Sequence, residues 1–173
     1  NENDSQFALG IIYYENKLVP RDINKAIYYL SLSANQNDRI AQYNLGVLFY
    51  ENKLVPRDIN KAIHYYSLAA KQNHLFSILY LAGIYNDNIY VPRDFTKVVN
   101  YLVNAAKLDC INAQHILGAI FCNGNSVPRD VNRGIYYYKM AADCGYCDSQ
   151  FDLAKIYYTG EYVERDINKA IHY

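Results

Sequence analysis

The sequence predicts an all-α chain of helix–turn–helix repeats stacked into a solenoid, and two observations support this fold class. The four prolines, Pro20, Pro56, Pro92 and Pro128, recur every 36 residues, and an Arg-Asp pair follows each of them. On both sides of each proline, apolar residues recur at the three- and four-residue spacing of a helix. One helix pair cannot bury its own apolar faces, whereas stacked copies can.

The period divides the chain into five copies. The predicted repeats cover residues 5–40, 41–76, 77–112, 113–148 and 149–173. Residues 14–27 are identical to residues 50–63, which indicates recent duplication. The fifth copy stops within its second helix, so we expect the sequence to be a fragment of a longer array.

The first helix of each repeat, helix A, is predicted over residues 40–51 in the second copy. One apolar face at helical spacing consists of Ala41, Leu45, Leu48 and Phe49. Gly46 lies in mid-helix, where glycine costs up to about 1 kcal/mol relative to alanine. Every copy nevertheless keeps a small residue there, namely Gly10, Gly46, Ala82, Gly118 or Ala154. We therefore expect a neighbouring helix to approach closely at this position.

Pro56 separates helix A from helix B because it lacks an amide hydrogen and disfavours helical backbone at the residue before it. Asp58 is the predicted N-cap of helix B, which spans residues 59–72, because its carboxylate can accept a backbone N–H of the first turn. We expect the preceding arginine to be an exposed neighbour rather than part of an anion site, and His64 to lie on a solvated flank. The predicted buried stripe of helix B consists of Ala62, Tyr66, Ala69 and Ala70.

Charge and composition argue against several classes of function. Lys plus Arg total 17 and Asp plus Glu total 17, whereas proteins that bind nucleic acid usually carry a basic excess. We therefore expect no nucleic-acid partner. The sequence contains no run of about twenty apolar residues, so we expect no membrane insertion. The sequence shows no nucleophile–base set and no phosphate-binding glycine loop, so we expect neither catalysis nor a cofactor.

The cysteines do not recur at a fixed repeat position, so we interpret them as free thiols of a reducing, cytoplasmic compartment. Cys144 and Cys147 have the spacing of a redox motif, but they lie in a predicted turn between repeats and lack the strand context of such motifs. A metal site would need two further ligands, so none is expected. The other two cysteines are Cys110 and Cys122.

The repeat pattern resembles the Sel-like repeat family, a close relative of tetratricopeptide repeats, over residues 5–173. The motif is Ala-x-x-x-Leu-Gly-x-x-(Tyr/Phe), followed by Val-x-x-Asp-x-x-Lys-Ala-x-x-x-Tyr-x-x-Ala-Ala. In the second copy it is carried by Ala41, Leu45, Gly46, Phe49, Val55, Asp58, Lys61, Ala62, Tyr66, Ala69 and Ala70. The third copy departs from it at Val98 and at Leu81-Ala82-Gly83, and the fourth at Gly134. The resemblance implies a right-handed superhelix whose A helices line a concave face, and a scaffold that assembles protein complexes.

A second apolar stripe lies on helix A, opposite the first. By analogy with tetratricopeptide repeats these positions face the groove, where aromatic and apolar side chains would suit a peptide with hydrophobic anchors. The alternative is that the stripe packs against the neighbouring repeat. The stripe consists of Phe7, Ile11 and Tyr14; Tyr43, Val47 and Tyr50; Leu79, Gly83 and Asn86; His115, Ala119 and Cys122; and Phe151, Lys155 and Tyr158 in the five copies.

The leading functional hypothesis is a protein-interaction scaffold or adaptor that binds a peptide or protein partner in this groove. A passive spacer between the domains of a larger protein is the alternative. Some cysteine-rich members of the family are associated with β-lactam hydrolysis, but this sequence lacks their paired cysteines in each repeat. The incomplete fifth copy leaves apolar surface uncovered, which predicts end-to-end self-association of the array.

Overall fold

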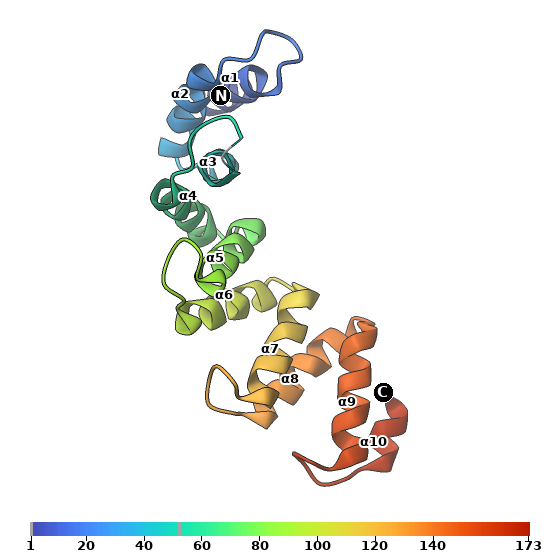
Figure 1. The fold of residues 1–173 in the computed structure, drawn as a ribbon. Coiled ribbons are helices and arrows are strands. Elements are labelled where there is room, and N and C mark those ends of the chain that lie inside the picture. The colour runs from blue at the N-terminus through green and yellow to red at the C-terminus, as the bar shows by residue number, and fades with distance from the viewer. Residues whose placement is uncertain (1, 52) are drawn as a thin grey trace. The chain divides into compact units, whose positions relative to one another are not determined.

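The computed structural model describes residues 2–51 and 53–173, with side chains from Asp4 onwards. These residues form helices joined by turns and loops, without a strand (Figure 1). The odd-numbered helices are the A helices of the repeats and the even-numbered ones are the B helices. The predicted helices at 40–51 and 59–72 are observed as α3 and α4, to within one residue at each end, so the all-α fold of helix–turn–helix repeats is confirmed. The helices are α1 (Glu2–Glu15), α2 (Ile23–Asn35), α3 (Arg39–Glu51), α4 (Ile59–Lys71), α5 (Leu75–Asp87), α6 (Phe95–Lys107), α7 (Ile111–Asn123), α8 (Val131–Asp143), α9 (Cys147–Thr159) and α10 (Ile167–His172).

The chain divides into two compact units, which we describe separately. The first comprises the described residues up to Ile84 together with Ile89–Val91, and it holds α1 to α4 and most of α5. The second comprises Tyr85–Asn88 and Pro92–Tyr173, and it holds α6 to α10.

The core of the first unit forms where consecutive repeats meet. Its buried cluster consists of Leu30, Ala34, Ala41, Leu45 and Leu48, from α2 and α3. Three side chains of α1 pack against this cluster. The predicted apolar face of helix A is therefore buried in the second copy, apart from Phe49, which is half-buried and stacks on Tyr65.

The core of the second unit repeats this arrangement with α7, α8 and α9. Tyr157 of α9 also stacks on Tyr173 with ring centroids 6.2 Å apart, which attaches the short α10 segment to α9. The buried cluster consists of Cys122, Ile135, Tyr138, Ala142, Leu153, Ile156 and Tyr157.

The small residue in the middle of helix A allows helix B of the same repeat to pack closely against it. A Cβ atom on Gly46 would lie 2.5 Å from the ring of Tyr66, and one on Gly118 would lie 2.5 Å from the ring of Tyr138. Real Cβ atoms essentially never approach other atoms so closely, so the aromatic ring occupies the space that a side chain would need. The expected close approach is confirmed at both glycines.

The aspartate of each Arg-Asp pair caps helix B, as predicted. The Asp58 carboxylate accepts the backbone N–H of Lys61 at 3.0 Å, which satisfies one of the free donors of the first turn. This hydrogen bond lowers the pKa of the Asp58 carboxyl group. The equivalent caps are Asp22, Asp94, Asp130 and Asp166.

The arginines of the first three pairs make a contact that was not predicted from the sequence. The Arg57 Nε donates to the Tyr50 carbonyl at 2.6 Å, and Arg21 and Arg93 make the same bond at 2.8 and 2.6 Å. The Arg57 guanidinium also lies over the ring of Tyr90, 4.8 Å from its centroid. The arginine therefore ties the loop between the two helices to the end of helix A.

A glutamine that bonds to the preceding repeat was also not predicted, although glutamine recurs at this repeat position in the sequence. Gln42 is buried, and its Nε2 donates to the Ala34 carbonyl at 3.1 Å, at the end of the preceding helix B. Gln114 and Gln150 make the equivalent bonds, each at 3.3 Å. This amide joins each of these A helices to the repeat before it.

Candidate partner-binding surface

In the first unit, the second stripe of helix A contacts the following repeat. Phe7, Ile11 and Tyr14 pack against the α2–α3 cluster. The Tyr43 ring lies 4.6 Å from that of His74, and the Tyr50 ring lies 5.5 Å from that of Tyr80. These rings therefore contribute to packing between repeats, and their role in binding a partner stays a prediction.

The stripe continues into the second unit with different chemistry. His115 Nδ1 lies 2.9 Å from Ser149 Oγ and 3.9 Å from Asp152 Oδ2. Cys122 is buried, and burial raises the pKa of its thiol to about 11, which keeps the thiol protonated at neutral pH. Among the other stripe residues, Val47 and Leu79 are half-buried. The exposed ones are Asn86, Phe151, Lys155 and Tyr158.

A trough between α1 and α3 brings together stripe residues of the first two copies. Two cavities of about 200 Å³ and about 180 Å³ share Tyr14, Val47 and Leu48. The first is also lined by Arg21, Glu51, Lys53 and Leu54. The second is also lined by Ile11, Glu15, Leu30 and Asn44.

The charged residues around the trough already have partners within the chain. Lys53 pairs with Glu51 at 2.9 Å, and Lys17 pairs with Glu15 at 3.0 Å. Arg21 donates from Nε to the Tyr14 carbonyl. Because these charges are paired locally, the surface that the trough leaves for a partner is mainly apolar.

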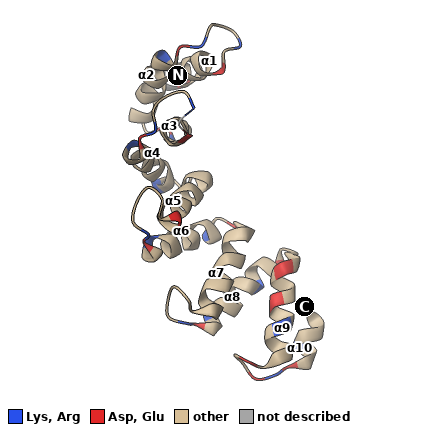
Figure 2. Cartoon of the chain, viewed as in Figure 1, with Lys and Arg blue, Asp and Glu red and all other residues tan. Residues whose placement is uncertain are grey.

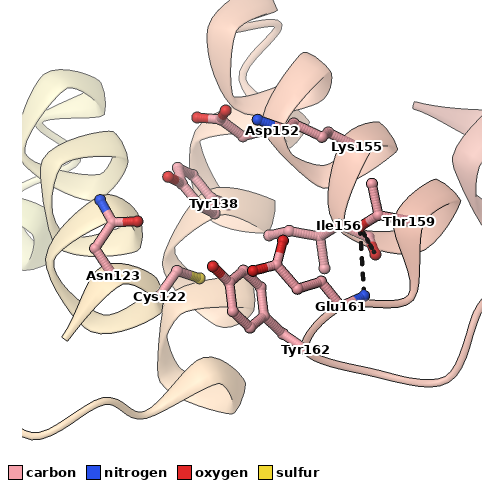
Figure 3. Close-up of a pocket in the computed structure, with 9 residues that line it drawn as sticks. All are labelled: Cys122, Asn123, Tyr138, Asp152, Lys155, Ile156, Thr159, Glu161 and Tyr162. Carbon is pink, nitrogen blue, oxygen red and sulfur yellow. Dashed lines mark hydrogen bonds between the residues drawn. The ribbon is translucent and has the colours of Figure 1, made fainter.

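The second unit has a polar cavity at the same position of the repeat (Figure 3). It measures about 110 Å³, and its lining residues lie three repeats after residues that line the trough, for example Lys155 after Val47. Figure 3 shows Asp152 and Lys155 projecting from α9, with Glu161 and Tyr162 on the loop that follows. The lining consists of Cys122, Asn123, Tyr138, Asp152, Lys155, Ile156, Thr159, Glu161 and Tyr162.

The polar residues of this cavity were not predicted, apart from Lys155. Their signal in the sequence is a change of residue type at a fixed repeat position. Asp152 occupies the position of Asn44 and Tyr80 in earlier copies, and Glu161 occupies that of Lys53 and Ile89. The repeat therefore fixes where a cavity forms, and individual substitutions fix its chemistry.

Two tyrosines at one repeat position differ in their surroundings and give a testable contrast. The Tyr66 hydroxyl is buried and has no hydrogen-bond partner among the described residues. The Tyr138 hydroxyl lies beside the Asp152 carboxylate, and burial together with this carboxylate raises its pKa. An unpaired buried hydroxyl costs about 1–3 kcal/mol.

We expect Tyr66→Phe to raise the free energy of unfolding by about 1 kcal/mol, because it removes that unpaired group. Tyr138→Phe, its matched control, should give no gain, because the hydroxyl that it removes lies beside a carboxylate. Urea unfolding of both variants measures the difference. An equal effect of the two substitutions would contradict the contrast in their surroundings.

Other candidate sites receive little support from the described residues. No three His, Cys, Asp or Glu side chains among them come together as a metal site would require. Cys144 and Cys147 are exposed free thiols around the turn between α8 and α9.

No described helix is both long and apolar enough to cross a bilayer. Figure 2 shows Lys and Arg beside Asp and Glu in the loops, and Lys–Asp pairs such as Lys61–Asp58 recur at the starts of B helices.

Comparison with solved structures supports the fold. A protective antigen of uropathogenic Escherichia coli strains that displays an SLR fold is 25% identical with a TM-score of 0.83, over 98% of this chain and 36% of that one. A Sel1 repeat protein from Oxalobacter formigenes is 29% identical with a TM-score of 0.71, over 98% of this chain and 70% of that one. The cysteine-rich protein B of Helicobacter pylori is 23% identical with a TM-score of 0.53, over 78% of this chain and 96% of that one, and shows the fold alone. This chain thus spans about a third of the length of the first of these proteins.

The family comparison agrees with the repeat pattern. No curated protein matches the sequence. The model of the Sel1 repeat matches residues 3–38, 39–74, 111–146 and 147–173, which is most of the chain. The long unmatched stretch, residues 75–110, covers most of the third copy, where Val98 and Leu81-Ala82-Gly83 depart from the motif. The chain belongs to the Sel1 repeat family.

Proposed function

We propose that this chain is an interaction module that binds a peptide segment of a protein partner along its A helices. Sel1 repeats are generally protein-interaction scaffolds, which supports this class of function. The observation that carries the proposal is the trough between α1 and α3. Its floor is apolar at Val47 and Leu48, and the charges at its edge are paired within the chain.

The size of the trough suits one apolar side chain of a partner. An apolar cavity of about 150 Å³ in another protein takes up benzene, and the larger of the two cavities here measures about 200 Å³. Fully burying a leucine or phenylalanine side chain stabilises a complex by about 1.5–3 kcal/mol. A few such anchors provide most of the binding energy in typical interfaces.

The rest of the stripe forms the wider candidate surface. Phe151 and Tyr158 are largely exposed and offer aromatic rings directly. Ile11 and Tyr14 line the trough and would lie beside a bound segment. Cys122 and Lys155 line the separate polar cavity of the second unit. The other predicted groove residues are the half-buried Phe7, Tyr43, Tyr50, Leu79 and His115, and the exposed Asn86.

The test selects short random peptides, displayed on phage, against the immobilised chain and measures the affinity of the strongest peptide by fluorescence anisotropy. We expect selected peptides to share a leucine, isoleucine or phenylalanine. Val47→Lys should weaken binding about tenfold or more, which corresponds to about 1.4 kcal/mol, because it places an ammonium group in the trough. Lysine already occurs at the equivalent position 155, so the helix position tolerates it.

Lys155→Val is the matched control, because it makes the reverse exchange in the second unit. It should leave the affinity for the selected peptide unchanged. Failure to select any peptide, as a passive spacer predicts, would contradict the proposed function. An unchanged affinity of Val47→Lys would contradict the trough as its site.

A further inference from the structure

The polar cavity of the second unit carries a carboxylate where the first two copies carry an ion pair. In those copies a loop lysine pairs with the glutamate two residues before it, as Lys53 does with Glu51 at 2.9 Å. The equivalent residues of the fifth copy are Glu161 and Thr159. Thr159 Oγ1 accepts the backbone N–H of Glu161 at 3.4 Å, as Figure 3 shows. The charge at this loop position is therefore reversed, and the lysine–glutamate pair is absent.

Asp152 adds a second carboxylate to the lining. It occupies the position of the neutral Asn44, which lines the trough. The Asp152 carboxylate lies 3.9 Å from His115 Nδ1, and among the described residues neither Asp152 nor Glu161 forms an ion pair with a lysine or arginine. The lining thus holds two carboxylates and a single ammonium group, that of Lys155, so negative charge is in excess.

Two buried polar groups are directed into the same cavity. Cys122 is 3% exposed, and its thiol makes no hydrogen bond with the described residues. Figure 3 shows its sulfur pointing toward Tyr162. Tyr138 is 5% exposed, and its hydroxyl lies beside the Asp152 carboxylate. Thiol sulfur and hydroxyl oxygen both accept hydrogen bonds, so the walls as well as the carboxylates favour a ligand that donates them.

This position of the repeat stays open where a further repeat packs against the same helix. In the first unit, α3 lines the trough through Val47 and Leu48. The rings of Tyr43 and Tyr50 on the same helix lie against that of Tyr80 on α5. The trough is therefore accessible although α5 covers α3, and we take the polar cavity at the equivalent position of α9 to be a feature of the repeat junction.

We infer that the polar cavity receives an arginine side chain of the protein partner, held by the carboxylates of Asp152 and Glu161. A planar guanidinium donates in a fixed fork to carboxylates and stacks on aromatic rings, and Tyr138 and Tyr162 supply such rings. The cavity measures about 110 Å³, less than the cavity of about 150 Å³ that takes up benzene in another protein, and a guanidinium group is smaller than benzene. The inference deepens the proposed function and rests on it for the source of the side chain.

The cations near the cavity leave room for this guanidinium. Lys155 is exposed, and a long lysine side chain keeps its ammonium group in water. Arg129 is not part of the lining. Its guanidinium lies 5.0 Å from the centroid of the Tyr162 ring and donates to the Asn123 carbonyl at 3.3 Å. The carboxylates are therefore the charged groups that an entering side chain meets.

The test titrates the isotope-labelled chain with N-acetyl-arginine N-methylamide and follows its backbone amides by NMR. We expect saturable shifts at residues 152–162 and binding about tenfold or more tighter than that of the citrulline analogue, which has the same shape without the charge. Free arginine should bind no more tightly than the blocked derivative, because a side-chain pocket does not use its terminal charges. The aspartate analogue should not bind.

Two variants use residues that the second copy carries at the same positions. Asp152→Asn restores the residue type of Asn44, and Glu161→Lys restores that of Lys53. Each should weaken binding of the arginine derivative about tenfold or more, because each removes a carboxylate that pairs with the guanidinium. Glu164→Lys is the control, because it makes the same charge change at an exposed residue of the same loop that does not line the cavity.

Several results would overturn the inference. These are equal affinity for the arginine and citrulline derivatives, tighter binding of the aspartate analogue, the absence of shifts at residues 152–162, and an equal effect of Glu164→Lys and Glu161→Lys. The amide spectrum of each variant checks its fold, and Asp152→Asn, which keeps the side-chain shape, decides alone if Glu161→Lys perturbs it. The titration uses no selected peptide, so its failure would leave the trough proposal standing, and failure of the peptide selection would leave this result unaffected.

Discussion

Ala62→Asp should lower the free energy of unfolding by about 4 kcal/mol or more, which places it among the exceptional single substitutions. Ala62 is fully buried on α4, the helix on which Tyr66 packs closely against Gly46 of α3. A carboxylate at this position would be buried without a partner. Natural domains are stable by only about 5–15 kcal/mol, so we expect loss of the cooperative thermal transition or a large fall in its midpoint.

His64→Asp is the matched control, two residues along the same helix. His64 is exposed, so the same new charge stays in water and should change stability by about 0.5 kcal/mol or less. Thermal and urea unfolding of both variants, followed by circular dichroism, make the comparison. Equal losses at the two positions would show that the buried face of α4 has been assigned wrongly.

The helices and their caps were predictable because local chemistry fixes them. Pro56 cannot continue helix A, and Asp58 caps helix B through a hydrogen bond three residues along the chain. The small residue at Gly46 likewise predicted a close approach. Such features depend on neighbours in sequence or on one repeated contact, so a single sequence with several copies reveals them.

The environment of the second stripe could not be derived in the same way. Periodicity shows which residues share a face of a helix but not what lies opposite that face. The contact of Tyr43 with His74 joins two repeats, and nothing local in the sequence specifies it. The arginine bond to the end of helix A was missed for a related reason, because its acceptor is a backbone carbonyl that has no signature in the sequence.

The trough and the polar cavity show how a repeat protein can vary its chemistry while keeping its geometry. The trough and the polar cavity occupy the same position of the repeat, so their location follows from the period. Their linings differ through exchanges such as Val47 for Lys155 and Leu30 for Tyr138. Copies that diverge at cavity positions while keeping their caps are consistent with different contacts to a partner in the two units.

Tyr50→Ala distinguishes packing from partner binding within the stripe. The Tyr50 ring lies 5.5 Å from that of Tyr80 and 6.1 Å from that of Tyr90, between two consecutive repeats. Removing it leaves a cavity at this junction, so we expect the free energy of unfolding to fall by about 3 kcal/mol, the lower end for buried aromatic residues. Urea unfolding of the chain without any partner measures this loss.

Tyr158→Ala removes the same ring from the same position of the fifth copy. Tyr158 is largely exposed and has few neighbours to lose, so its substitution should change stability by about 0.5 kcal/mol or less. A large loss at Tyr50 with little change at Tyr158 means that the stripe serves packing wherever a following repeat covers it. Partner binding would then fall to the exposed stripe positions and to the cavities. A small loss at Tyr50, together with weaker binding of the selected peptide, would instead assign Tyr50 to the groove.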